Sequence, residues 1–501
     1  IFFRNCLMPV QCRKCGAPHF TKDCTAHPYF KARVAVLPDD VLATIAQWLP
    51  THSVVRRLMQ CCREWHRIVC TEVPLRLTMG CCEMDAHNLP HIFTKHKVGR
   101  LSIAWNASVA APNPFKKLPL QADTLTTLSA SFAEPRHCNE LAAALPALTN
   151  LHTLQLQGCG WKNQAAPHIA ALITKSRVLE SLTLDSVHFG EVGLATFAKA
   201  LQEPHVLKKL CVVNLTSWSN EMAMHCVPLI AQAPGLTELH LMPHNPVHYS
   251  SEACTALGQA LYANSSLHTL ALGLIAEDGV QDVAQELFLK PTISTVKLRG
   301  CFPAEEVAGL VHGNAFKRCI HLQTPLTKTA VEQVASNMLD NTFLQELCLQ
   351  SATIDSDGAV SLAQSLPSAL RLHTLLLPDN RIEDEGFQAL LTALQHHDTL
   401  THLSLCSNAV GDLGAGALAA VLSGPCTLQR VDLSHNHIGT EGASALGAAL
   451  RKRRGKAVAL ALHSNPFVNF KHYVALKDWK ALGRLRPQKS ALCLPPASPR
   501  L

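Results

Sequence analysis

The feature that most constrains the fold is a repeat of 28 residues near the C-terminal end of the chain. The pattern Leu372-x-x-Leu375-x-Leu377-x-x-Asn380-x-Ile382 occurs three times at this period. The later copies carry Leu400, Leu403, Leu405, Asn408 and Val410, and then Leu428, Val431, Leu433, Asn436 and Ile438. A fixed internal period of this length indicates an array of one supersecondary unit rather than a single globular core.

Weaker copies extend the array toward the N-terminus with spacings of 24 to 31 residues. The leucine core starts again at Leu344, Ile293, Leu267, Leu236, Leu207, Leu179, Leu151 and Leu125, and fainter copies begin near Val98 and Lys317. Within each unit the alternating Leu-x-Leu predicts a short strand with one buried face. The helical spacing of apolar residues after Gly386, Gly414 and Gly442 predicts a helix. The asparagine suits a turn in which its side-chain amide bonds backbone groups.

These repeats resemble the ribonuclease-inhibitor-like subtype of leucine-rich repeats. The resemblance implies an α/β fold, a leucine-rich-repeat solenoid or horseshoe over residues 76–466. Residues between the strand leucines would then point to the concave face, where such folds usually bind partners. That column comprises Thr153, Gln155, Ser181, Thr183, Lys209, Cys211, Glu238, His240, Thr295, Lys297, Glu346, Cys348, His402, Ser404, Arg430 and Asp432. A groove for nucleic acid would be rich in Lys and Arg, so we expect a protein partner here. A scaffold whose inner face is only solvated is the alternative.

A helical module is expected ahead of the repeats, in residues 31–75. Its apolar residues follow a helical period, Pro38 suits a first helical turn, and Pro50 ends the element. The segment resembles an F-box, the helical module that docks on a Skp-class adaptor of cullin-RING ubiquitin ligases. The resemblance implies that docking uses Leu37, Pro38, Val41, Leu42, Ile45, Leu49 and Trp65. The alternative is an unrelated helical cap that shields the first repeat.

A metal-binding arm is expected in residues 1–30, where Cys12, Cys15, His19 and Cys24 have the spacing C-x2-C-x3-H-x4-C. Three thiolates and one imidazole supply the four ligands of a closed, structural zinc site. The segment resembles a CCHC zinc knuckle, although three residues rather than four precede His19 and Pro18 stands where glycine is usual. The resemblance implies single-stranded RNA binding, for which Arg13, Lys14, Phe20 and Lys22 are the contact candidates. The alternative is a metal clip for an arm too short to have its own core.

Charge divides the chain into two basic ends and an acidic body. Residues 1–35 hold six Lys and Arg against one acidic residue, and residues 451–501 hold twelve against one. The intervening 26 basic and 35 acidic residues give the body a net negative charge. The basic tail, 467–501, and the run Arg451, Lys452, Arg453 and Arg454 before it are therefore candidates for contacts with RNA phosphates. Solubilising ends are the alternative.

Composition and missing motifs exclude several classes. Hydrophobic residues make up 48% of the chain, which excludes a mostly disordered protein, and no apolar run is long enough to span a membrane. Twenty cysteines without a signal peptide predict an intracellular reducing compartment. The choice between cytoplasm or nucleus and mitochondrial matrix stays open, because Ile1 fits a processed transit peptide and a fragment equally well.

The signatures of nucleotide, ester and peptide hydrolysis are absent, so we expect neither an enzyme nor a small-molecule substrate. Two functional hypotheses remain. In the first, the F-box-like module recruits a ubiquitin ligase and the repeats present a protein substrate. In the second, the chain is a structural or assembly component of an organellar ribonucleoprotein, such as the mitochondrial ribosome, with the knuckle and the basic tail on RNA.

Overall fold

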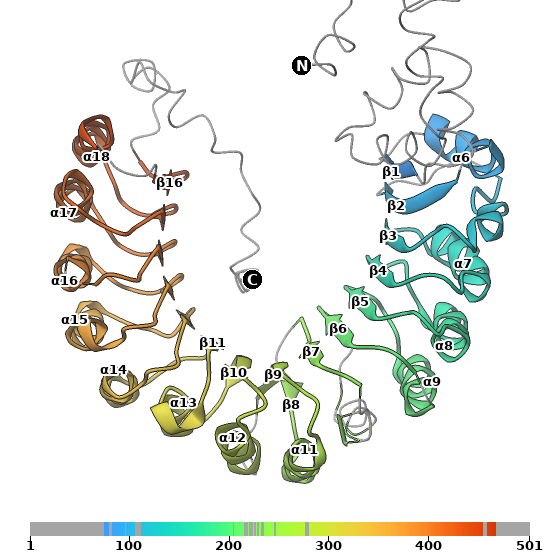
Figure 1. The fold of residues 1–501 in the computed structure, drawn as a ribbon, viewed down its shortest axis with the longest axis horizontal. Coiled ribbons are helices and arrows are strands. Elements are labelled where there is room, and N and C mark those ends of the chain that lie inside the picture. Colours follow the sequence, from blue (N-terminus) through green and yellow to red (C-terminus); the bar gives the residue numbers. More distant parts are fainter. Residues whose placement is uncertain are drawn as a thin grey trace, which may run out of the picture. The chain divides into compact units, whose positions relative to one another are not determined.

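The computed structural model describes residues 75–466, except residues 80–82, 96, 106–111, 204, 245–246, 276–279, 396, 454–457 and most of 215–234. The chain divides into two compact units, Ile1–Cys211 (unit 1) and Val212–Leu501 (unit 2). Each unit alternates parallel strands with helices, which confirms the α/β leucine-rich-repeat solenoid (Figure 1). None of the described helices combines the length and apolarity needed to cross a bilayer.

Unit 1 holds parallel strands in the order β1-β2-β3-β4-β5, and β6 follows them along the chain. The strands are β1 (Leu75–Met79), β2 (Val98–Trp105), β3 (Thr127–Phe132), β4 (Thr153–Gln157), β5 (Ser181–Asp185) and β6 (Lys209–Val213). The helices are α6 (Glu83–Lys95), α7 (Pro135–Ala144), α8 (Ala166–Lys175) and α9 (Glu191–Gln202).

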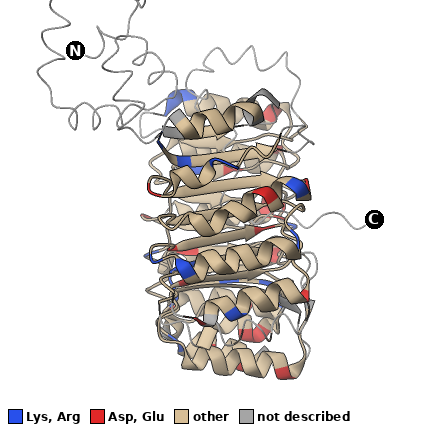
Figure 2. Ribbon diagram, turned by 90° about the vertical axis from the view of Figure 1, so that its right-hand side faces the viewer, with Lys and Arg blue, Asp and Glu red and all other residues tan. Residues whose placement is uncertain are grey.

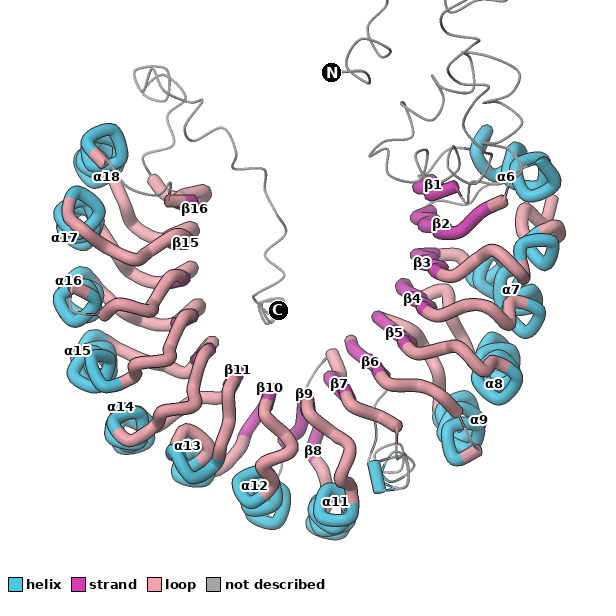
Figure 3. The backbone as a smooth tube through the Cα atoms, in the orientation of Figure 1, coloured by secondary structure: helices cyan, strands magenta, loops and turns pink. Residues whose placement is uncertain are grey.

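Unit 2 has its own parallel strands in the order β7, β9 and then β10 to β16, and the short β8 pairs with β9. Its strands are β7 (Glu238–Met242), β8 (Val247–His248), β9 (Thr269–Ile275), β10 (Thr295–Cys301), β11 (Cys319–Gln323), β12 (Glu346–Leu349), β13 (Thr374–Leu376), β14 (His402–Ser404), β15 (Arg430–Asp432) and β16 (Ala459–Ala461). Its helices are α11 (Ser251–Ala263), α12 (Val280–Leu289), α13 (Ala304–Gly309), α14 (Lys328–Leu339), α15 (Ser356–Ser365), α16 (Asp384–Leu394), α17 (Asp412–Ser423) and α18 (Thr440–Lys452). Within each unit the strands form one face and the helices the other (Figure 3).

The repeat leucines form the core between strands and helices. Leu375, Leu403 and Val431 lie side by side in register across β13, β14 and β15, and each is at most 2% exposed. Burying one such side chain contributes about 1.5–3 kcal/mol. Because each repeat adds several such leucines, the stacking of neighbouring repeats supplies the stability that a single repeat lacks.

The repeat asparagines bond the backbone as the sequence predicts. Asn408 Nδ2 donates to Leu377 O (2.8 Å), and Asn408 Oδ1 accepts from Ile382 N (3.0 Å). The same pair of bonds is made by Asn380, Asn436 and Asn465. Each amide thereby satisfies a buried carbonyl and a buried N–H of the preceding repeat.

The repeat glycines fit a cap that comes from the preceding repeat. Asp384, in the first turn of α16, accepts through Oδ1 from Gly411 N (2.6 Å) and Gly414 N (2.9 Å) at the start of α17. Asp412 does the same for Gly439 and Gly442 at the start of α18. A Cβ added at Gly414 would lie 2.6 Å from the Asp384 carboxylate, so a side chain there would displace the cap.

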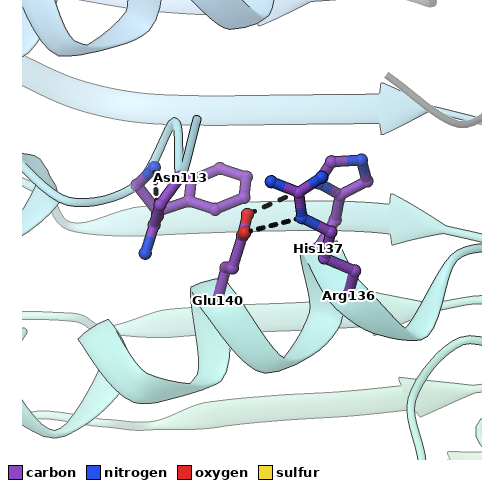
Figure 4. Close-up of polar contacts among 5 residues, drawn as sticks. Asn113, Arg136, His137 and Glu140 are labelled. Atoms are coloured by element: carbon purple, nitrogen blue, oxygen red, sulfur yellow. Dashed lines mark hydrogen bonds and ion pairs between the residues drawn. The ribbon is translucent and has the colours of Figure 1, made fainter. Parts of the chain in front are cut away.

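An aromatic cluster packs between β2, β3 and α7 of unit 1. Trp105 packs on Phe132 with ring centroids 5.5 Å apart, and His137 meets Trp105 edge-on at 5.4 Å. The Glu140 carboxylate faces Arg136 and His137, with Arg136 Nε 3.0 Å from Oε1 and His137 Nδ1 3.6 Å from Oε2 (Figure 4). Because these polar contacts lie within α7, they stabilise the helix that covers the cluster.

One repeat departs from the leucine pattern in its core. Lys317 occupies the position that Leu344 holds in the next repeat, and it is fully buried. Its ammonium donates to Lys290 O (2.7 Å). Burial lowers the pKa of Lys317 to about 8 from its ordinary 10.5, since the charged form loses its hydration.

Candidate functional site

The residues between the strand leucines form a continuous strand face in each unit. In unit 1, register places Thr153 beside Ser181 and Gln155 beside Thr183 across β4 and β5. The leucines between them, such as Leu154, are fully buried, whereas Gln155 is exposed. The alternation that the sequence predicts is therefore present, and the side chains on this face are available to a partner where they are exposed.

The strand face of unit 2 carries both signs of charge. Lys297 lies beside His321, and Arg430 lies beside His402. Glu346 lies between Cys319 and Thr374. On the ribbon of Figure 2, which is seen from outside the strand face, Lys and Arg (blue) and Asp and Glu (red) are both scattered among the helices and loops. A mixed surface of this kind suits a protein partner better than a nucleic acid backbone.

Cys319 and His321 of β11 and Glu346 of β12 form a cluster on this face. One ligand-type atom from each lies within 4.8 Å of the other two. His321 Nε2 is 2.7 Å from Glu346 Oε1, and register pairs Cys319 directly with Glu346. His321 is buried, whereas the Glu346 side chain is 26% exposed.

The electrostatics of the cluster centre on the Glu346 carboxylate. Burial first and this carboxylate second raise the pKa of the Cys319 thiol to about 12, although Lys297 opposes the shift. The pKa of Glu346 is lowered, chiefly because His321 hydrogen-bonds to it. The thiol therefore stays protonated at neutral pH and hydrogen-bonds to the Glu346 carboxylate. Such an arrangement does not activate a cysteine nucleophile, which needs a lowered thiol pKa and an adjacent base.

Most residues that the sequence predicts as sites lie outside the described residues. These are the zinc ligands Cys12, Cys15, His19 and Cys24; the docking residues Leu37, Pro38, Val41, Leu42, Ile45, Leu49 and Trp65; and the RNA-contact candidates Arg13, Lys14, Phe20, Lys22 and Arg454. Zinc, RNA and the predicted compartment stay predictions.

Three of the RNA-contact candidates lie among the described residues, and they differ in exposure and in hydrogen bonding. Arg451 and Lys452 are exposed in the last turn of α18. Arg453 instead donates through Nη1 to Leu422 O (3.0 Å) and through Nη2 to Cys426 O (3.1 Å). Arg453 is therefore bound to the preceding repeat, whereas its two neighbours are accessible.

Cys319 and His321 were missed by the sequence reasoning. Lys317 stands in place of the first leucine of their repeat, so the pattern is too faint there to assign residues to the strand face. The remaining signal is Ile320 and Leu322, whose alternation places Cys319 and His321 beside the predicted face residues Glu346 and Cys348. That alternation was the only sequence clue to the cluster.

Comparisons with known proteins give two family matches. A leucine-rich repeat model ("Leucine Rich repeat") matches residues 340–363, 396–419 and 424–447. An "F-box-like" model matches residues 34–75. Among solved structures, Leiomodin-1 Actin-Binding Site 2 is similar at 18% identity with a TM-score of 0.27, over 32% of this chain and 90% of that chain. No curated protein matches the chain.

Proposed function

We propose that this chain, in which an F-box-like segment precedes a leucine-rich-repeat solenoid, is a non-catalytic adaptor that presents a protein partner to a cullin-RING ubiquitin ligase. The observation that carries the proposal is the order of the two modules. The F-box-like match covers residues 34–75, and the first strand of the repeat sheet begins at Leu75. Both modules are of kinds that typically bind proteins without catalysis, so together they support a protein-interaction adaptor.

The two modules divide the work of such an adaptor. The F-box-like apolar face, with Leu42 and Ile45, would bind a Skp-class adaptor by burying those side chains. The strand face of the solenoid would hold the partner, because its mixed polar surface is available and repeat arrays use such faces for binding. In this proposal the chain binds two proteins and catalyses no reaction itself.

Docking is tested with Leu42→Asp combined with Ile45→Asp in the full chain. A carboxylate on an apolar docking face has no partner, so we expect the variant to lose binding to a purified Skp-class protein. The matched control is Val192→Asp with Leu413→Asp, two apolar residues that are 74% and 77% exposed on α9 and α17. The control is expected to bind like the wild type.

Two results would contradict the docking proposal. One is a wild-type chain that does not bind the Skp-class protein. The other is a double variant that loses thermal stability and helicity together with binding, because that outcome identifies the segment as a cap on the first repeat. Circular dichroism of both variants distinguishes a lost interface from a lost fold.

The partner surface is tested on exposed residues of the strand face. Gln155→Arg combined with Arg430→Glu changes charge on both units. We expect affinity purification to lose the partner protein but retain the Skp-class adaptor. Lys199→Glu with Gln388→Arg makes similar changes on exposed helix positions and is expected to retain both. Equal partner recovery from the two variants would remove the strand face from the proposal.

We also propose structural zinc on Cys12, Cys15, His19 and Cys24, because their residue types and spacing supply a complete tetrahedral ligand set. Cys12→Ser with Cys15→Ser is expected to lower the zinc content of the full chain by one equivalent in elemental analysis. Unchanged content would show that these residues bind no metal.

A further inference from the structure

We propose that Cys319, His321 and Glu346 form a second zinc-binding site, on the strand face of unit 2. The three residues come from two adjacent strands, and their ligand-type atoms already lie within 4.8 Å of one another. This site is separate in sequence from the predicted zinc ligands of residues 1–30. It does not depend on the adaptor function.

The backbone brings the three side chains to one place. β11 and β12 are parallel and in register, with Cys319 opposite Glu346 and His321 opposite Cys348. Cys319 and His321 are two residues apart on one strand, so both point to the same face of the sheet. The buried residues Ile320 and Leu322 fix β11 from its other face. The ligands are therefore held on rigid elements, as a specific metal site requires.

The donor set favours zinc over the hard divalent cations. A thiolate sulfur, an imidazole nitrogen and a carboxylate oxygen are all ordinary zinc ligands, whereas Mg²⁺ and Ca²⁺ select oxygen ligands. Three protein ligands leave one tetrahedral position for water or for a side chain of a bound protein. The latter would place the metal within the surface proposed to hold a partner.

The distances allow coordination with small side-chain movements. Zinc–ligand bonds of about 2.0–2.3 Å place tetrahedral ligand atoms roughly 3.3–3.8 Å apart. His321 Nε2 and Glu346 Oε1, now 2.7 Å apart, would separate by about half an ångström to reach that spacing. The other pairs, at no more than 4.8 Å, would close by about 1.5 Å at most.

The charges balance when the metal displaces the thiol proton. A Cys319 thiolate and the Glu346 carboxylate supply two negative charges for Zn²⁺, and His321 binds as the neutral imidazole. Lys297 lies beside His321 on β10 and repels the cation, which weakens the site. His402 on β14 and Arg430 on β15 lie farther along the same face.

The test measures zinc in the full chain with the predicted knuckle disabled. In a background of Cys12→Ser and Cys15→Ser, the purified protein is equilibrated with zinc, dialysed and subjected to elemental analysis. We expect one equivalent of zinc to remain. Adding Cys319→Ser or Glu346→Gln is expected to reduce the content to near zero, because losing a ligand weakens binding by more than the roughly 10–100-fold effect of losing an outer partner.

Two controls accompany this test: a matched cysteine variant checks that the effect is specific to Cys319, and a cobalt spectrum identifies sulfur as a ligand. Cys406→Ser alters another partly buried free cysteine of unit 2 and is expected to retain the full equivalent. Cobalt in place of zinc reports coordination directly, since thiolate-to-cobalt absorption requires a bound sulfur. That absorption is expected in the background protein, absent after Cys319→Ser, and unchanged by excess Mg²⁺.

Two outcomes would overturn the site. One is a background protein that retains no zinc and shows no thiolate-to-cobalt absorption. The other is a zinc content that Cys319→Ser and Glu346→Gln leave unchanged. Glu346→Gln keeps a hydrogen-bond acceptor for His321, so circular dichroism like that of the wild type will show that lost metal does not reflect lost structure.

Discussion

Replacing Lys317 with methionine is expected to stabilise the protein. Lys317 is fully buried at a position that the repeat fills with leucine, and its ammonium has a hydrogen bond to Lys290 O. Methionine is unbranched and similar in length, so it fills the same space without a charge. The substitution therefore removes the desolvation cost of a buried cation and keeps the apolar burial that the lysine stem already has.

The magnitude follows from the displaced pKa. A fall from 10.5 to about 8 corresponds to about 3 kcal/mol of native-state destabilisation at neutral pH, since each pKa unit equals about 1.4 kcal/mol. Methionine leaves the Lys290 carbonyl without this donor, which costs about 1–3 kcal/mol. The methylene stem of Lys317 is already buried, so methionine adds little further apolar burial. The expected net gain in the free energy of unfolding is on the order of 1 kcal/mol.

Urea unfolding followed by circular dichroism, at about pH 7 and about pH 9.5, measures both the gain and its origin. Between the native pKa of Lys317, about 8, and its ordinary value of 10.5, the unfolded chain binds more protons than the native chain. The contribution of Lys317 to stability therefore rises with pH in this window. The advantage of Lys317→Met over the wild type should consequently shrink as the pH rises.

Lys328→Met serves as the control. Lys328 is exposed and pairs with Asp357 at 2.8 Å in water, so its removal is expected to leave the stability nearly unchanged. A Lys317→Met protein that is less stable than the wild type would refute the reasoning. An advantage that stays equal at the two pH values would also refute it, because the buried charge could not then be its source.

Substitutions at three further residues test the repeat contacts. Asn436→Ala removes the bonds to Leu405 O and Val410 N and is expected to cost about 2–4 kcal/mol in urea unfolding. Asp412→Ala removes the cap of α18 and is expected to cost about 1–2 kcal/mol in the same assay, whereas Asp412→Asn should cost less. Burial lowers the pKa of His397 below its ordinary 6.5, so its unfolded form binds more protons and its contribution to stability falls as the pH drops below 6.5. His397→Asn is therefore expected to weaken the loss of thermal stability in acid, and a melting temperature with the same acid dependence as the wild type would contradict this.

Much of the fold can be predicted from the sequence because the same pattern of residues recurs at a fixed period. The period places the strands at Leu375, Leu403 and Val431, and it identifies Asn408 and Asn436 as backbone-bonding residues. The caps could not be predicted in the same way. The phase of the glycines is visible in the sequence, but the carboxylate that bonds them comes from the preceding repeat, so the contact appears only when repeats are stacked.

The candidate metal cluster was also predictable only in part. The face residue Glu346 follows from the strand alternation, but its partners Cys319 and His321 do not, because Lys317 interrupts the leucine pattern just before them. Distances between side chains on neighbouring strands also depend on register, which the period gives only where the pattern is strong. The sequence thus predicts one member of the cluster and leaves the cluster itself to the structure.

The repeat that contains β11 departs from the pattern on both of its faces, and the two departures have separate contacts. Lys317 bonds Lys290 O in the core, whereas Cys319 and His321 contact Glu346 on the strand face. The buried lysine therefore does not account for the ligand-type residues, which need a reason of their own. A leucine-rich repeat requires neither cysteine nor histidine on its strand face, since those positions do not pack in the core. Metal binding supplies a reason that involves all three side chains at once, and local departures of this kind are expected where a site imposes its own requirements.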